Sequence, residues 1–125
     1  MADNLDAVDI IYDIIKSCGV TVVKDRSSRD QDGEFIVIRS SGNTNLASVN
    51  VAQVNVNIFI PRPSNGMVNR PRVETLRTTI TNLIKNASDP EGYYCVIDQV
   101  FSALLEDVRK DYDCFTIRYE LTLNN

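Results

Sequence analysis

Apolar residues recur at every second position in two segments of this chain, and this alternation constrains the fold more than any other feature. The first segment spans 54–60 and the second spans 115–123. Because successive side chains of a β-strand point to opposite faces of a sheet, each segment is expected to be a strand with one buried face. Further strands rich in β-branched residues are expected at "GVTVVKD" (19–25), "EFIVIRS" (34–40) and "YYCVID" (93–98). The segment "VFSALLEDV" (100–108) fits either a helical turn or a strand.

Two other segments have helical periodicity. Each has one apolar face; the first comprises Leu5, Val8, Ile11, Tyr12 and Ile15, and the second Val73, Leu76, Ile80, Leu83 and Ala87. Gly19 is suited to ending the first helix, and Pro71 to the first turn of the second. The second helix has a polar face with little charge, formed by Thr75, Arg77, Thr78, Thr79, Thr81 and Asn82. The low charge of this face fits contact with a partner, and it also fits neutral drift without a function. The sequence leaves both explanations open.

These elements predict one α+β domain over residues 1–125, with an antiparallel sheet and two helices packed on one face. A loop or a flexible hairpin tip is expected near 40–48, which is polar, and a flexible loop is expected near 61–70, which contains Pro61 and Pro63 and is followed by Pro71. A register change is expected near Ala52. On the last strand, the side chains predicted to face the helices are Phe115, Ile117, Tyr119 and Leu121.

The sequence lacks histidine and the motifs that usually carry catalysis. It has no histidine, no glycine-rich phosphate loop and no GxSxG elbow, and its three cysteines show no CxxC spacing. Asp30, Asp32 and Glu34 could hold a hard cation, but a solvated turn is the favoured interpretation. Asp111 and Asp113 are interpreted as protection of a strand edge. We therefore expect no enzymatic activity, no cofactor and no metal.

The segment "IFIPRPSNGMVNRPRVETL" (58–76) joins a strand to a helix through a cationic connection. The chain has a net charge of −4 and a pI near 4.7, yet residues 61–85 carry five basic groups and one acidic group. Residues 86–125 carry three basic and eight acidic groups. Such blocks suggest complementary patches, within one subunit or between neighbours. The connection could bind nucleic acid, dock on a protein or merely connect.

Nucleic-acid binding would depend on Arg62, Arg70, Arg72 and Arg77 alone. No helix-turn-helix spacing, RNP aromatic motif or GxxG clamp accompanies them, and an acidic chain repels phosphate elsewhere. We therefore expect no sequence-specific nucleic-acid binding. No apolar run approaches the roughly 18 residues of a membrane span, and the acidic N-terminal segment is unlike a secretory signal. We expect no membrane contact, and a protein that stays in the compartment of its synthesis.

The order of elements resembles the tail terminator, or tail-completion, family of long-tailed phages and prophages. The resemblance covers about residues 3–123: an N-terminal helix, a hairpin similar to "GVTVVKD…EFIVIRSSG", a polar excursion, a β-branched strand, a proline-containing loop, a helix and a closing antiparallel pair. It implies a structural virion protein that forms a hexameric ring, caps the tail tube and joins tail to head. The implied partners are further copies, the tail tube protein and a head-completion protein. The implied location is the virion tail, with assembly in the bacterial host cytoplasm.

Ring closure needs two different complementary patches on each subunit. Arg62, Arg70, Arg72 and Arg77 are the candidate partner contacts, because arginine pairs carboxylates bidentately. We expect the 61–72 loop to be a docking element that is poorly ordered in the isolated subunit. Reversal of its three arginines to glutamate is expected to leave the fold unchanged. The alternatives are another neck or head–tail completion protein, or a small cytosolic protein-binding adaptor.

Overall fold

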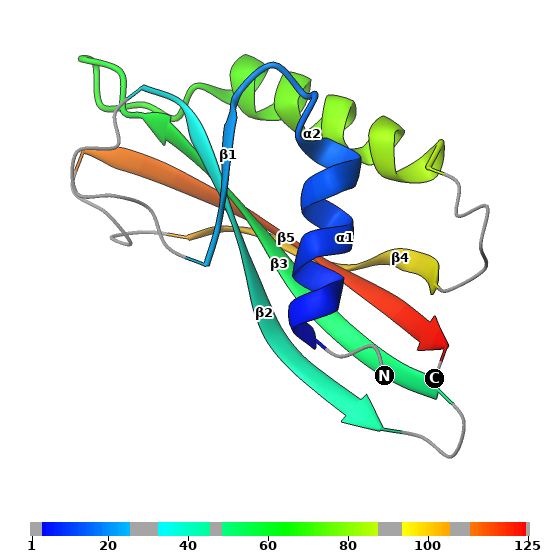
Figure 1. Ribbon diagram of the computed structural model, residues 1–125. Coiled ribbons are helices and arrows are strands. Elements are labelled where there is room, and N and C mark those ends of the chain that lie inside the picture. Colours follow the sequence, from blue (N-terminus) through cyan, green and yellow to red (C-terminus); the bar gives the residue numbers. More distant parts are fainter. Residues whose placement is uncertain (1–3, 26–32, 46–48, 88–93, 106–110, 125) are drawn as a thin grey trace.

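The structure is a computed structural model that describes residues 4–25, 33–45, 49–87, 94–105 and 111–124. Two helices and five strands occupy these ranges (Figure 1). In chain order they are α1 (Asn4–Ile15), β1 (Thr21–Lys24), β2 (Phe35–Asn45), β3 (Val49–Pro61), α2 (Arg70–Lys85), β4 (Tyr94–Leu105) and β5 (Tyr112–Asn124). Neither helix in the described ranges is long and apolar enough to cross a membrane.

The five strands form one sheet in the order β1-β2-β3-β5-β4. β2, β3, β5 and β4 are antiparallel to their neighbours, whereas β1 runs parallel to β2. The α+β class is thus confirmed, but the hairpin expected from 19–25 and 34–40 is wrong. A tight hairpin turn joins antiparallel strands, whereas ten residues (25–34) separate β1 from β2.

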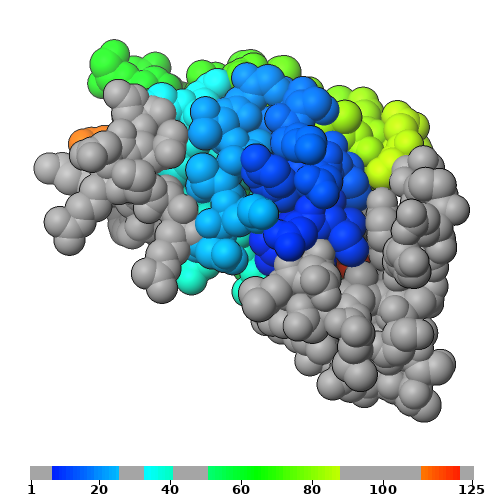
Figure 2. Space-filling model, viewed as in Figure 1, coloured from blue at the N-terminus to red at the C-terminus, as the bar shows by residue number. Residues whose placement is uncertain are grey.

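Both helices pack on the same face of the sheet, as predicted (Figure 1). In Figure 2, α1 and β1 (blue) cover the middle of this face, and the end of α2 (yellow-green) lies at its margin. Of the four β5 side chains predicted to face the helices, three are buried and Phe115 is partly buried against the same core. Ile84 is buried on α2 where Leu83 and Ala87 were expected, because the buried stripe follows 73, 76, 80 and 84. The helix-facing core of the sheet comprises Ile36, Ile38, Ala52, Val54, Val56, Ile58, Ile60, Ile117, Tyr119 and Leu121.

The polar segment near 40–48 was expected to be a loop or a flexible hairpin tip, and its residues 40–45 belong to a strand. β2 continues to Asn45 and pairs with β3 along this stretch, and residues 46–48 lie outside the described ranges. The expected register change is in β2, between Ser40 and Gly42, rather than in β3, which pairs with β5 without interruption. Backbone pairing to β3 sustains a strand here even though the side chains are polar, because ladder hydrogen bonds do not depend on side-chain type.

The opposite face of the sheet has an aromatic half and a polar half. Phe35 stacks on Phe59 with ring centroids 4.8 Å apart, and Tyr112 contacts both edge to face. Farther along, directly opposed residues of β3 and β5 are joined by side-chain hydrogen bonds, which stabilise the strand pairing. These pairs are Gln53 with Glu120 (3.4 Å), Asn55 with Arg118 (2.9 Å) and Asn57 with Thr116 (2.7 Å).

Candidate partner-binding surfaces

The connection between β3 and α2 (residues 62–69, here the β3–α2 loop) has internal structure. The Gly66 amide donates to the Pro63 carbonyl at 2.9 Å, and Gly66 has a positive φ of 75°. The Asn65 side chain accepts a hydrogen bond from the Met67 amide at 2.9 Å. Val68 packs against the main core. These contacts provide local anchors for the loop, which was expected to be poorly ordered in the isolated subunit.

Arg62 is tied to the start of β5. Its Nε lies 3.4 Å from Asp113 Oδ1, its Nη2 donates to the Tyr112 carbonyl at 3.3 Å, and its backbone amide donates to the Asp111 carbonyl at 2.8 Å. The Asp113 side chain is only 11% exposed, and its Oδ2 is buried without a hydrogen-bond partner. The edge-protection interpretation of Asp111 and Asp113 is wrong, since β5 lies inside the sheet between β3 and β4.

Arg72 forms a bidentate pair with Glu34. Its Nε and Nη2 each donate to one oxygen of the carboxylate at 2.7 Å. This hydrogen bonding raises the pKa of Arg72 above its ordinary value, and partial burial opposes the shift. Asn69 caps α2 by accepting from the Arg72 amide, and Pro71 lies in the first turn of the helix, as predicted. Arg72 therefore joins the beginning of α2 to the chain just before β2.

These two pairs overturn one expectation. Arg62 and Arg72 already bind carboxylates of their own chain, so reversing them to glutamate would place like charges together. The complementary charge blocks of the sequence are therefore matched in part within one subunit. The sequence could not show this, because Glu34 and Asp113 are 38 and 51 positions away from their partners.

Arg70 and Met67 differ from these paired arginines. Arg70 is exposed and has no ion pair within the described residues. Met67 is 68% exposed, and it is the one large hydrophobic side chain that is exposed among residues whose exposure is described. An exposed flexible thioether beside a free guanidinium offers apolar and charged contact to another polypeptide.

A second unoccupied feature lies at the far end of the hairpin formed by β2 and β3. β1 accompanies β2 only from Phe35 to Ile38. Among the strands that the structure describes, residues 42–45 pair with β3 alone. A strand edge without a partner presents backbone amides and carbonyls to which another strand can add.

The polar face of α2 contains threonines in two different states. Thr75 and Thr79 donate their hydroxyls to the carbonyls four residues earlier, Pro71 and Thr75, at 2.9 Å each. Thr78 and Thr81 make no hydrogen bond of this kind within the described ranges. The Thr81 hydroxyl instead interacts with the Tyr119 hydroxyl of β5.

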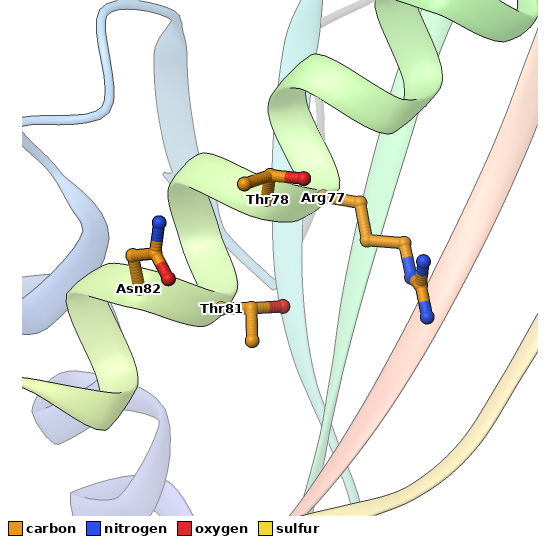
Figure 3. A pocket seen from close by; sticks show the side chains of 4 residues that line it. All are labelled: Arg77, Thr78, Thr81 and Asn82. Atoms are coloured by element: carbon orange, nitrogen blue, oxygen red, sulfur yellow. The ribbon is translucent and has the colours of Figure 1, made fainter.

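Thr78 and Thr81 line a pocket of about 170 Å³ together with Arg77 and Asn82. Figure 3 shows that Arg77 and Thr81 project from the side of α2 on which β5 lies. Arg77 Nη1 lies 3.3 Å from Glu74, one turn earlier, but Arg77 Nε is buried and has no hydrogen-bond partner among the residues that the structure describes. Arg77 is therefore only partly matched, unlike Arg62 and Arg72.

Tyr119 of β5 interacts with two of the residues that line this pocket, Thr81 and Arg77, and was predicted only as a core residue. It is 2% exposed, and its hydroxyl is buried without a hydrogen bond of standard geometry. Burial raises the pKa of Tyr119, while the nearby Thr81 hydroxyl and the Arg77 charge act to lower it. These effects place the Tyr119 oxygen close to two residues that line the pocket. One feature of the sequence could have indicated this: a core position of β5 holds a tyrosine, whose buried hydroxyl usually has a hydrogen-bond partner, rather than an aliphatic residue.

The four arginines predicted as contacts do not form one patch. Arg62, Arg70 and Arg72 belong to the loop end of the molecule, and Arg77 lies about 10 Å along the α2 axis from Arg70, at 1.5 Å per residue. Of the acidic turn considered for a cation, Asp30 and Asp32 lie outside the described residues and Glu34 binds Arg72. In the described ranges no three histidine, cysteine, aspartate or glutamate residues gather closely enough to hold a metal ion.

No protein-family model matches this chain, and a search of curated proteins gives no match. The arrangement of surfaces is therefore interpreted from its own geometry and chemistry.

Proposed function

We propose that this protein is a structural virion protein that assembles into a ring, most simply a hexamer, and caps the tail tube of a long-tailed phage. The proposal unites the resemblance to tail terminators with one structural observation. Among the residues that the structure describes, two unlike contact features have no partner and lie toward opposite ends of β3: the edge of β2 at 42–45, and the junction of the β3–α2 loop with α2, where Met67 and Arg70 are exposed. Residues 42–45 pair with Asn50–Gln53, and β3 ends at Pro61, so the strand separates the two features by about 30 Å at roughly 3.3 Å per residue.

Two unlike surfaces on one subunit support heterologous association. A self-complementary surface gives a dimer, whereas two different surfaces that bind each other give a ring if the rotation closes. The exposed Met67 supplies apolar area and Arg70 supplies a charge that no described group of the chain neutralises. The ring would present its remaining surfaces to the tail tube protein and to a head-completion protein.

Assembly can be tested with two variants that each damage one surface. The loop variant is Met67→Ser with Arg70→Glu, and the edge variant is Asn43→Lys with Asn45→Lys, since lysine on an edge opposes strand addition. Light scattering with size exclusion, together with electron microscopy, should show rings for the unchanged protein and monomers for each variant. An equimolar mixture should give heterodimers that do not close, because each variant retains one intact surface.

Three results would count against the proposal. A monomer at all concentrations, with no effect on elongation of a polymerising tail tube protein, would contradict the ring and the cap. Dimers that both variants abolish, and that the mixture does not restore, would indicate one self-complementary surface. A stable monomer that captures one soluble partner through Met67 and Arg70 would favour the adaptor.

A further inference from the structure

Arg70 lies at the start of α2 without a carboxylate to bind. It is exposed and makes no ion pair among the residues that the structure describes. In the proposed ring, the neighbouring copy that receives the β3–α2 loop presents the edge of β2 at 42–45. That edge has the sequence Gly-Asn-Thr-Asn and carries no charge. A carboxylate for Arg70 therefore has to come from an element that lies beside the edge.

That element is α1, which packs on β2 and β3. Figure 1 shows that the first turns of α1 lie toward the end of β2 and its last turn lies away from it. The outer side of α1 carries Asp9 and Asp13, whose side chains are 61% and 69% exposed. Ile10 and Ile14 follow them at the same spacing and are only partly buried. Because residues four apart are neighbours on a helix, these four side chains form one acidic and partly apolar surface.

The two aspartates are held more loosely than the carboxylates that bind arginines within the subunit. Each pairs through Oδ1 with an exposed lysine, at 2.9 Å from Asp9 and at 3.5 Å from Asp13. By contrast, the side chains of Glu34 and Asp113 are only 29% and 11% exposed. Exposed lysine pairs contribute little to stability, and aspartates four residues apart repel each other. A guanidinium from a neighbour can therefore bind them, since it pairs carboxylates better than an ammonium does.

We infer that the Arg70 guanidinium of one copy binds Asp9 and Asp13 on α1 of a second copy of this chain. Met67 of the first copy then lies against the partly exposed isoleucines beside these aspartates. The second copy is the partner because the two surfaces have opposite charge. Residues 61–72 contain three basic and no acidic residues, whereas α1 contains three acidic and no basic ones. Such complementarity steers association and fixes the register of the two subunits. The inference rests on the proposed function, because it names the surface that receives the loop.

Exchange of the two charges tests this contact on the full chain. Arg70→Glu and Asp13→Arg should each weaken association by about tenfold or more, as expected for a close charge pair across an interface. The double variant, which carries both reversals, should recover most of the lost affinity. Asp9→Arg should weaken association less than Asp13→Arg, because its shorter lysine pair leaves it less available. Sedimentation at several concentrations measures association, and melting temperatures check that every variant keeps its fold.

Matched exchanges at other exposed charges control for the net charge of the chain. Asp25 is an exposed aspartate that follows β1, and Lys85 is an exposed cation at the other end of α2. Arg70→Glu combined with Asp25→Arg, and Lys85→Glu combined with Asp13→Arg, should not recover association. Recovery by either combination to the level of the Arg70 and Asp13 exchange would indicate a general charge effect and overturn the inference.

A mixture of the two single variants shows that the contact joins different copies. Arg70→Glu and Asp13→Arg proteins should associate with each other better than either does alone, because each copy then meets opposite charge on both surfaces. Rings of the unchanged protein that neither the exchange nor the mixture affects in this way would overturn the inference and leave the ring intact. A dimer or an open filament that follows the exchange would support the inference and contradict the ring. A monomer at all concentrations would contradict both.

Discussion

The β3–α2 loop and the α2 pocket both contain arginines, but they differ in how these arginines are matched. At the loop end, Arg62 and Arg72 bind Asp113 and Glu34 of the same chain. At the pocket, Arg77 is only partly matched by Glu74, and its Nε remains buried without an acceptor. Among the described residues, the group left unpaired at the loop end is an acceptor, Asp113 Oδ2, whereas at the pocket it is a donor, Arg77 Nε.

This difference shows that a basic segment in a sequence is not in itself a binding surface. The most conspicuous charges of 61–72 hold the loop to β5 and to the chain before β2. The polar face of α2 is less conspicuous in the sequence, and its Arg77 Nε has no acceptor among the described residues. The criterion that separates the two regions is the presence of an acceptor within the chain, which depends on contacts between distant residues.

The largest expected loss of stability comes from truncating a buried residue that lies between the two regions. Ile117 lies on β5 between Asp113 at the loop end and Tyr119 at the pocket, and it is fully buried. Ile117→Ala should lower the free energy of unfolding by about 2–5 kcal/mol, because it removes buried methyl groups and leaves a cavity. Urea denaturation followed by circular dichroism measures this change. A loss below about 1 kcal/mol would mean that the strand can repack around the gap.

Loss of the Arg72–Glu34 pair should have the next largest effect. Arg72→Gln should cost about 1–2 kcal/mol, less than a buried pair, because both side chains are about one-third exposed and solvent screens them. The matched change at the pocket, Arg77→Gln, should cost about 0.5 kcal/mol or less in the free protein. Denaturation of both variants tests the comparison directly.

A double-mutant cycle gives the control for this prediction. Arg72→Gln and Glu34→Gln should be strongly non-additive, since each removes the partner of the other. Arg77→Gln combined with Glu34→Gln should be additive. Equal losses for Arg72→Gln and Arg77→Gln would remove the distinction between a matched and a partly matched arginine.

A smaller effect is expected in the pH dependence of stability. Burial raises the pKa of Tyr119 above its ordinary value of 10.0, so the folded protein keeps a proton that the unfolded chain loses. Above pH 10 the unfolded state therefore binds fewer protons, and the free energy of unfolding falls as pH rises. Below pH 10 this group has no effect.

Tyr119→Phe should reduce that fall in stability between pH 10 and the folded pKa. Burial also raises the pKa of the Cys114 thiol above 9.0, but this contribution is present in both proteins and cancels in the comparison. Denaturation at a series of pH values measures the difference, and absorbance of tyrosinate shows whether one tyrosine titrates late. Identical pH profiles would mean that water reaches the Tyr119 hydroxyl.

The fold was largely predictable because its signals are local. Alternation of apolar residues located β3 and β5, and helical spacing located α1 and α2. The parallel pairing of β1 was missed because strand direction depends on the path of a connection and not on the strand's own residues. The extension of β2 to Asn45 was missed because its support comes from pairing with β3, which polar side chains do not reveal.

The candidate sites were less predictable for the same reason. Arg77 was named from its charge, but its electrostatic effect on Tyr119, which is 42 positions away on another element, could not be inferred from spacing. Arg62 and Arg72 were named as partner contacts because their carboxylates in β5 and before β2 could not be inferred from spacing. The sequence alone does not distinguish an arginine that pairs with a distant carboxylate from one that has no such pair.

The smallest expected effect on stability is at Arg70 and Met67. Both side chains are exposed, and Arg70 has no ion pair within the described residues, so Arg70→Gln and Met67→Ser should each change the free energy of unfolding by no more than about 0.5 kcal/mol. Their effect on assembly should be large by comparison, because these exposed side chains make contacts only when a neighbouring subunit binds. Sedimentation at several concentrations measures association, with Lys85→Gln as a control for the loss of one exposed cation. Unchanged association of the Arg70→Gln, Met67→Ser double variant would mean that the β3–α2 loop only connects the strand to the helix. The edge of β2 at 42–45 would then be the one remaining candidate for contact between subunits among the described residues.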